Sequence, residues 1–184
     1  MGTGAETATG DDDTGTTTLV VMGVSGSGKT TIARGVAEAL GWLYLEGDDF
    51  HPGRNVEKMA SGVPLDDEDR WPWLRAIGAA IGTAEGAGEN LVLTCSALKR
   101  AYRDLLGEGH PSVRFCRLDV SPEVLRDRLD ARRGHYMPAS LLDSQLATLE
   151  PLAPDEPGLT VRADGAPAEV LTDVLAAIRP QERT

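Results

Sequence analysis

One short stretch of the chain has residue types and spacing that are typical of phosphate chemistry. Residues 23–30 read Gly-Val-Ser-Gly-Ser-Gly-Lys-Thr and fit G-x-x-x-x-G-K-[ST], the P-loop pattern. Glycines there let backbone N–H groups turn inward onto phosphate oxygens, and the following helix points its positive end at the same anion. The lysine of such a loop, here Lys29, bridges the β- and γ-phosphates, and the hydroxyl of Thr30 binds Mg²⁺. The motif predicts a site for ATP and Mg²⁺ that is formed by Gly23, Val24, Ser25, Gly26, Ser27, Gly28, Lys29, Thr30 and Thr31.

The residues on either side supply the structural context that a P-loop requires. Residues 19–22 are apolar, as in a buried strand, and the apolar residues after the motif fall at helical spacing: Ile32, Val36, Ala39 and Leu40. The alternative is a chance glycine-rich turn. Such a turn does not require the strand pattern before it and the helix pattern after it, whereas a P-loop does.

Beyond the P-loop, short apolar runs alternate with segments of helical spacing. We expect further strands at 42–46, 91–95, 113–118 and 159–163, and helices at 54–60, around Trp73, around Tyr102, from Pro122, at 139–150 and at 167–178. The glycine-rich residues 82–90 are expected to form a surface turn. Such alternation predicts an α/β fold with a mainly parallel sheet covered by helices on both faces.

Composition limits the possible partners and the domain organisation. Residues 1–17 contain almost no apolar side chains, so we expect a disordered tail followed by a single domain at 18–184. The net charge of −11 argues against binding to nucleic acid. There is no apolar run long enough for a membrane span and no secretory signal pattern, which favours a cytoplasmic protein. Cys95 and Cys116 lie in apolar runs and are expected to be buried free thiols.

Charged residues follow two of the predicted strands. Glu46 ends the second predicted strand, and Asp48 and His51 lie in the loop that follows it, residues 47–52. Ligands of open α/β sheets bind beyond the carboxyl ends of strands. Simple turn chemistry is the alternative, because Gly-Asp also favours turns. Lys99 and Arg103 follow the third strand and suit an anionic ligand, whereas for the neighbouring Arg100 a solvated helix face is the better interpretation.

An arginine-rich segment predicts a lid. The helix that starts at Pro122 carries Arg126, Arg128, Arg132 and Arg133, stops at Gly134 and is followed by a second helix. This arrangement, roughly residues 126–140, is typical of a mobile lid that excludes water and brings cations to a transferring phosphoryl group. An ordinary basic helix in an acidic protein is the alternative.

The chain also carries a set of short motifs outside the P-loop. They are Gly47-Asp48, His51-Pro52, Asn55, Lys58-Met59, Ser61-Gly62, Pro64-Leu65, Asp67, Asp69-Arg70, Pro72-Trp73-Leu74, Cys95-Ser96-Ala97-Leu98-Lys99, Tyr102-Arg103-Asp104-Leu105-Leu106, Arg132, Gly134-His135, Ser144-Gln145 and Thr148-Leu149-Glu150. Together with the P-loop, these motifs resemble the gluconate kinases (gluconokinases), a branch of the small P-loop metabolite kinases. The resemblance extends over roughly residues 19–178.

The resemblance implies both an activity and a fold. The activity is phosphorylation of D-gluconate at its 6-hydroxyl by ATP, giving 6-phospho-D-gluconate and ADP, in the gluconate degradation that feeds the pentose phosphate pathway. The fold is a three-layer P-loop kinase fold, with a five-stranded, mainly parallel sheet of nucleoside-monophosphate-kinase type and a helical lid. Dependence on Mg²⁺ and, usually, a homodimer are also implied.

The acidic residues take their expected roles from this resemblance. Asp48 matches the substrate aspartate of these kinases and is expected to hold, and to deprotonate, the attacking hydroxyl. Glu46 stands where related kinases often carry an aspartate near the metal, and its longer side chain is expected to reach Mg²⁺ through water. With Lys29, Arg128 and Arg132, Asp48 completes the predicted catalytic set, in which the two arginines serve the nucleotide and the γ-phosphate.

The remaining predicted contacts concern the sugar acid. A carboxylate needs cations, and an arginine fork binds it at two places, so Arg70, Lys99 and Arg103 are the candidates for that end of gluconate. His51 is assigned to a sugar hydroxyl, with a purely structural turn histidine as the alternative. His135 is placed in the substrate set, at the lid hinge, and Gln145 is expected to reach the substrate from the returning helix.

Three other functions are alternatives for a chain that carries a P-loop. A kinase for shikimate or a related polyol acid would share the P-loop but not the block from Gly47 to Trp73. A GTPase switch is disfavoured because the guanine-reading N-K-x-D pattern is absent from the sequence. A nucleic-acid-repair kinase is disfavoured by the acidic charge.

Overall fold

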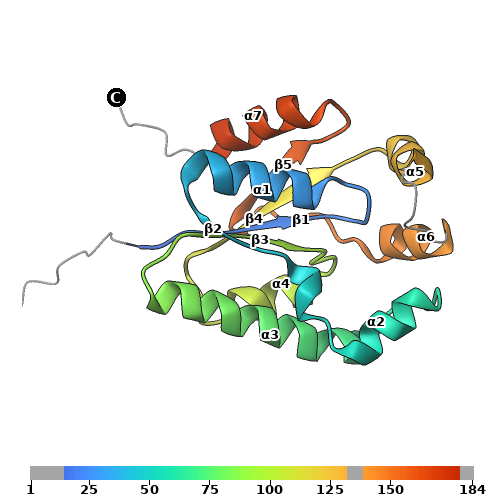
Figure 1. The fold of residues 1–184 in the computed structure, drawn as a ribbon, viewed down its shortest axis with the longest axis horizontal. Helices are drawn as coiled ribbons and strands as arrows, with labels where there is room; N and C mark the ends of the chain where they lie inside the picture. Colours follow the sequence, from blue (N-terminus) through green and yellow to red (C-terminus); the bar gives the residue numbers. More distant parts are fainter. Residues whose placement is uncertain (1–14, 132–138, 179–184) are drawn as a thin grey trace, which may run out of the picture.

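The computed structural model describes residues 15–131 and 139–178, which form one parallel sheet and its covering helices (Figure 1). The spatial order of the strands is β2-β3-β1-β4-β5. The strands are β1 (Thr18–Met22), β2 (Leu43–Leu45), β3 (Leu91–Cys95), β4 (Val113–Asp119) and β5 (Gly158–Arg162). The predicted α/β fold with a parallel sheet is thereby confirmed.

Helices cover both faces of the sheet. Figure 1 shows α1 and α7 above it, α3 and α4 below it, and α5 and α6 beside the end at which the strands finish. The helices are α1 (Lys29–Leu40), α2 (Gly53–Ala60), α3 (Asp67–Gly86), α4 (Arg100–Gly107), α5 (Pro122–Ala131), α6 (Ala139–Thr148) and α7 (Pro167–Ile178), with a short 3₁₀ turn, η1 (Gly47–Phe50). None of the helices in the described ranges is both long enough and apolar enough to cross a bilayer.

The central strand places the P-loop in the middle of the sheet. All five residues of β1 are buried, as expected for a parallel strand that is covered on both faces. Met22, its last residue, pairs with Cys95 of β3 on one side and Arg117 of β4 on the other. On the two sides of β1 the connections between strands run in opposite directions across the sheet. Open α/β sheets bind their ligands at such switch points. Both cysteines are buried free thiols, as predicted.

Helix α3 runs further than the sequence indicates. Asp66 caps its N-terminus in a reciprocal capping box with Asp69, and the helix continues to Gly86. Ile81 and Ala84 are buried, so a continuous apolar stripe outweighs the low helix propensity of the glycines in this segment. The expectation of a surface turn from residue 82 is therefore wrong, because the turn starts only after Gly86.

The predicted N-terminal tail and the predicted lid fall partly outside the described residues. Thr17, which we placed in the tail, donates its N–H to Asn90 and accepts one from Leu91, so the ordered domain already includes it. Residues 132–138, which hold Arg132 and His135 of the predicted lid, lie outside the described residues, as do residues 1–14 of the tail.

Candidate active site

The P-loop leaves the N-terminus of α1 open to an anion. Gly28, with φ of 94°, precedes the helix, and neither a side-chain cap nor an acidic residue in the first turn occupies its amides. The positive helix end therefore stays available for phosphate. Gly23 has φ of 147°, and a Cβ at this position would lie 2.9 Å from Ser27 Oγ. The backbone conformation at Gly23 and Gly28 thus favours glycine at both positions, as the motif predicts.

Two side chains bridge across this loop. Lys29 Nζ donates to Val24 O at 3.0 Å, which holds the lysine over the loop. The Ser25 N–H donates to Gln145 Oε1 at 2.7 Å, so a residue of α6 contacts the P-loop itself. Gln145 was predicted to reach the substrate; the contact that the structure gives it is with the P-loop.

The part of the site that is predicted to bind Mg²⁺ contains side-chain oxygen atoms, which are hard ligands. Thr30 Oγ1 donates to Glu46 Oε2 at 2.8 Å, Tyr44 OH donates to the same oxygen at 2.6 Å, and Thr94 donates to Glu46 Oε1. Burial pushes the pKa of Glu46 up, but these hydrogen bonds and the nearby Lys29 charge outweigh it, so the pKa is lowered. Burial, followed by the bond to Glu46, raises the pKa of Tyr44 to about 12.

This donor set fits Mg²⁺ that is carried largely by nucleotide phosphates. Among the described residues, no group of three or more His, Cys, Asp or Glu side chains is arranged to hold a metal. Mg²⁺ at kinase sites takes only one or two protein oxygens and keeps waters and substrate phosphates as its other ligands. The adjacent Thr30 hydroxyl and ionised Glu46 supply such oxygens.

The turn that carries Asp48 is fixed by β3 and α3. The Gly47 N–H donates to Thr94 Oγ1 at 3.0 Å, and Gly47 O accepts from Trp73 Nε1 at 2.7 Å. A Cβ at Gly47 would lie 1.9 Å from Thr94 O, so only glycine fits there. Asp48 projects from this turn with 77% of its side chain exposed, whereas the His51 side chain is only 5% exposed. Burial lowers the pKa of His51.

Arg70 and Lys99, two of the predicted carboxylate ligands, come together around one tyrosine. Arg70 Nη1 donates to Tyr102 OH at 3.0 Å, and Lys99 Nζ lies 2.8 and 3.0 Å from the two Asp67 oxygens. Tyr102 OH in turn donates to Asp67 Oδ1 at 2.5 Å. Hydrogen bonds from Lys99 and then Tyr102 lower the pKa of Asp67. Asp67 was among the motifs of the resemblance, but no role in the site was predicted for it.

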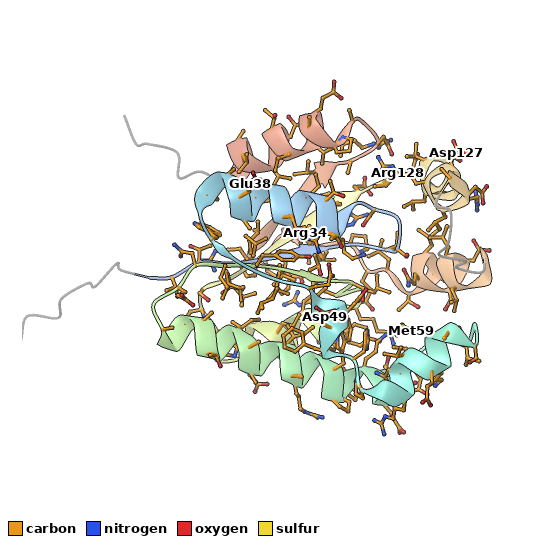
Figure 2. All side chains as sticks on the ribbon, viewed as in Figure 1. Arg34, Glu38, Asp49, Met59, Asp127 and Arg128 are labelled. Carbon is orange, nitrogen blue, oxygen red and sulfur yellow. The ribbon has the colours of Figure 1, made fainter. Side chains whose placement is uncertain are left out.

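Arg70 borders two hollows at the acceptor side of the P-loop. One, of about 540 Å³, includes Asp67 and Lys99 in its lining, and the other, of about 140 Å³, includes Met59 and Gln145. Figure 2 shows Met59 of α2 on one side of the sheet end and Arg128 of α5 on the opposite side. The hollows beside Arg70 and the cavity beside Arg128 thus have separate linings.

Arg103, the third predicted carboxylate ligand, is a structural residue instead. It is 1% exposed, and its guanidinium contacts Glu156 Oε1 at 2.5 Å and Oε2 at 3.0 Å. Its Nη atoms also donate to the carbonyls of Ala97, Leu98, Glu150 and Pro151. These partners use all five N–H donors of a guanidinium. The prediction that Arg103 binds substrate is therefore wrong.

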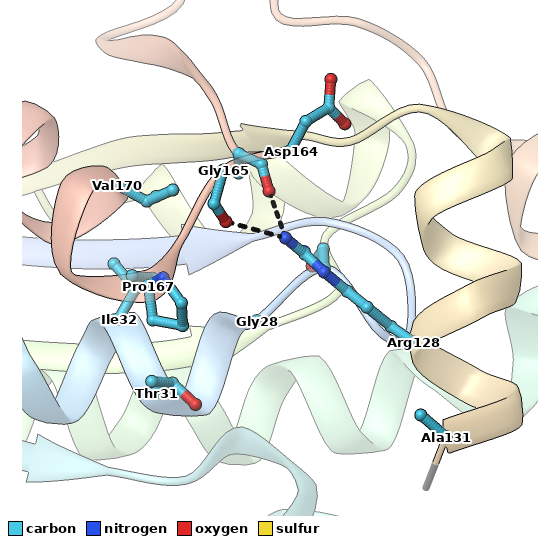
Figure 3. Close-up of a pocket in the computed structure, with 11 residues that line it drawn as sticks. Gly28, Thr31, Ile32, Arg128, Ala131, Asp164, Gly165, Pro167 and Val170 are labelled. Carbon is cyan, nitrogen blue, oxygen red and sulfur yellow. Dashed lines mark hydrogen bonds between the residues drawn. The ribbon is translucent and has the colours of Figure 1, made fainter.

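A cavity of about 450 Å³ lies beside the N-terminus of α1 (Figure 3). Thr31, predicted as an ATP residue, lines it together with Arg128 and the loop between β5 and α7. Arg128 Nη2 donates to Ala163 O at 2.7 Å and to Gly165 O at 3.3 Å, so it spans from α5 to that loop. Arg128 thus lines a cavity beside the helix end at which the P-loop is predicted to bind ATP. The sequence analysis gave the loop at Asp164–Gly165 no role, although it follows a strand end.

The fold and the site together define a P-loop kinase with an acceptor pocket for a small molecule. In comparisons with known proteins, the AAA domain family model matches residues 19–152. The gluconokinase of Gluconobacter oxydans (strain 621H) is 49% identical over 164 residues, which cover 89% of this chain and 92% of that protein. The chain belongs to the gluconokinase family, as the sequence motifs suggested.

Solved structures agree with this placement. A sugar kinase from Janibacter sp. HTCC2649 in its unliganded form has a TM-score of 0.84 at 51% identity, covering 92% of this chain and 99% of that one. A gluconokinase from Sinorhizobium meliloti 1021 has a TM-score of 0.79 at 45% identity, covering 87% and 90%. The predicted P-loop kinase fold and ATP-using enzyme class are confirmed.

Proposed function

We propose that this protein transfers the γ-phosphoryl group of ATP to the 6-hydroxyl of D-gluconate, giving 6-phospho-D-gluconate and ADP. Membership of the gluconokinase family at 49% identity is the observation that carries this proposal. The arrangement of the acceptor pocket supports it, because an exposed carboxylate at Asp48 and the cations Arg70 and Lys99 suit the two ends of a hydroxylated acid.

In the proposed reaction the two substrates approach from opposite sides of the P-loop. The gluconate oxygen forms a bond to the γ-phosphorus as the bond from that phosphorus to the β,γ-bridging oxygen breaks, and ADP carries the released charge. Asp48 holds the attacking hydroxyl and takes its proton, which then passes to solvent. Lys29 and the P-loop amides stabilise the phosphoryl oxygens, which is the larger part of such catalysis because the transition state is loose.

Thr30 would hold Mg²⁺ directly and Glu46 through a water molecule. When bound, the ion neutralises charge on the β- and γ-phosphate oxygens. Glu46 also keeps the Thr30 hydroxyl oriented by accepting a hydrogen bond from it at 2.8 Å.

The remaining assignments stay predictions. Arg128 and Arg132 together serve the nucleotide and the γ-phosphate, and His135 belongs to the substrate set at the lid hinge. A homodimer, a role in gluconate breakdown and a cytoplasmic location are also carried forward from the resemblance.

The position of the transferred phosphate tests the proposal. The protein is incubated with Mg²⁺-ATP and uniformly ¹³C-labelled gluconate, and the product is examined by ¹³C and ³¹P NMR. Coupling of phosphorus to C6 is the expected result. Coupling to another carbon would overturn the 6-hydroxyl assignment, and an absence of any phosphorylated sugar acid would overturn the proposed function.

A further inference from the structure

A completely buried asparagine beside the acceptor turn has a hydrogen-bonding pattern that the proposed reaction does not yet use. Asn55, on α2, is 0% exposed. Its Nδ2 donates to Asp69 O at 2.8 Å and lies 3.3 Å from His51 Nδ1. Its Oδ1 is buried, and no donor among the described residues reaches it. The hydrogen bonds that the structure gives the Asn55 side chain are therefore those of its N–H groups.

These contacts determine which ring nitrogen of His51 carries the proton. A backbone carbonyl only accepts, so the Asn55 atom that faces Asp69 O must be the amide nitrogen. The second hydrogen of that nitrogen points to His51 Nδ1, and an amide nitrogen cannot accept. His51 Nδ1 is therefore the acceptor, and in the neutral ring the proton sits on Nε2.

The ring plane is fixed by a second element. His51 stacks on Trp73 of α3, with ring centroids 4.1 Å apart and planes inclined by 14°. The same indole donates to Gly47 O, at the start of the turn that carries Asp48. Trp73 therefore aligns the imidazole with that turn, and Asn55 sets the protonation of its two nitrogens.

The proton-bearing nitrogen faces Asp48. His51 Nε2 lies 3.9 Å from Asp48 Oδ1, and 77% of the Asp48 side chain is exposed. A hydrogen bond needs a separation of about 2.7–3.2 Å, so a small rotation of the carboxylate closes the gap. Asp48 then keeps its other oxygen for the substrate hydroxyl.

We infer that His51 is a positioning residue, held by Asn55 and Trp73 in the Nε2–H form, which donates to Asp48 and orients that carboxylate toward the acceptor hydroxyl. This inference rests on the proposed acceptor role of Asp48. It gives His51 the role of a hydrogen-bond donor and leaves proton abstraction to Asp48. It also replaces the earlier assignment of His51 to a sugar hydroxyl.

Two matched substitutions separate a donor at Nε2 from a merely structural ring. In His51→Gln the side-chain amide N–H can reach the place of Nε2–H, whereas in His51→Asn it reaches only the place of Nδ1. We expect His51→Gln to keep kcat within about threefold, and His51→Asn and Asn55→Leu to lower it by about tenfold or more, as for other orienting partners. KM for ATP should stay unchanged in all three. His110→Gln, which alters a histidine bonded to Glu85 far from Asp48, is the control.

The tautomer can be read in the wild-type protein without any variant. The chain has three histidines, so a long-range ¹H–¹⁵N spectrum of the imidazole rings is simple, and the resonance lost in His51→Gln identifies His51. Protonation at Nε2 is the expected result, and protonation at Nδ1 would overturn the inference. Equal loss of kcat in His51→Gln and His51→Asn would also overturn it.

The two levels of the account remain distinguishable. If Asp48→Asn keeps full kcat, the proposed role of Asp48 is refuted, and with it the orienting role of His51, although the Nε2–H tautomer would still be found. If Asp48→Asn is inactive but the pair of His51 variants behaves alike, the proposed function stands and the inference is refuted.

Discussion

Replacement of Arg103 by methionine is expected to weaken the fold far more than it weakens substrate binding. The side chains of Arg103 and Glu156 are 1% and 3% exposed, and the guanidinium also holds carbonyls of two loops. Removal of one partner of a buried pair leaves the other charge uncompensated and costs about 3–5 kcal/mol. For a domain of this size that corresponds to a fall in Tm of about 6–20 °C.

The assay is urea unfolding followed by circular dichroism, together with steady-state kinetics well below the Tm. Arg100→Met is the matched control, because this neighbouring arginine is 41% exposed and has its shorter ion pairs with Asp155 and Asp104 at the surface. It lies 4.0 Å from Glu156. An exposed pair contributes about 0–1 kcal/mol, so the control should unfold almost like the wild type. The double variant Arg103→Met/Glu156→Leu should recover part of the lost stability, because no buried charge is left.

The stability difference between the Arg103 variant and the wild type should depend on pH. Burial raises the pKa of Glu156, but the bond from Arg103 and others outweigh it and the net pKa is lowered. In the wild type the pair therefore stabilises the fold above the unfolded pKa of Glu, about 4.3, and this contribution is lost as pH falls through the lower folded pKa. Without Arg103, only burial and weaker hydrogen bonds act on the Glu156 carboxylate. The loss of unfolding free energy relative to the wild type should therefore be largest at neutral pH and become smaller toward pH 4. A variant as stable as the wild type but with a raised KM for gluconate would refute the reasoning and restore Arg103 as a substrate ligand.

Three further substitutions test the site. Lys29→Ala should remove nearly all turnover and leave the unfolding midpoint unchanged; normal turnover would remove the P-loop lysine from the mechanism. Asp48→Asn should lower kcat by at least about a hundredfold with little change in KM for ATP, as expected for loss of a general base. A defect confined to ATP binding would show that Asp48 serves the nucleotide and not the acceptor. Glu46→Gln should raise the Mg²⁺ concentration needed for half-maximal rate, measured at fixed ATP, whereas an unchanged Mg²⁺ dependence would leave Glu46 with a purely structural role.

The parts of the site that the sequence predicted correctly depend on local patterns. The P-loop, the strand before it and the helix after it follow from spacing within a few residues, and so does the turn after β2. The role of Gly47 could not be predicted, because the carbonyl that excludes a side chain there belongs to Thr94, a residue of another strand. The capping box of α3 could be anticipated from its acids, whereas the end of the helix could not, because packing decides it.

The failures concern charges whose partners are distant in sequence. Arg103 looks like a ligand for an anion until Glu156, 53 residues away, is found to neutralise it in the interior. No role was predicted for Asp67, because its partners Tyr102 and Lys99 come from another helix and the loop before that helix. Sequence gives the position of a charge along the chain, but burial and pairing are properties of the folded molecule.

The central claim, that gluconate is the phosphoryl acceptor, is tested most directly by ADP release with Mg²⁺-ATP and a panel of acceptors. The panel contains gluconate, shikimate, glucose and nucleoside monophosphates, each at the same concentration, with Lys29→Ala as the inactive control. The account predicts strong stimulation of ADP release by gluconate alone. Stimulation by a different acceptor, or by none while ATP is still bound, would contradict it.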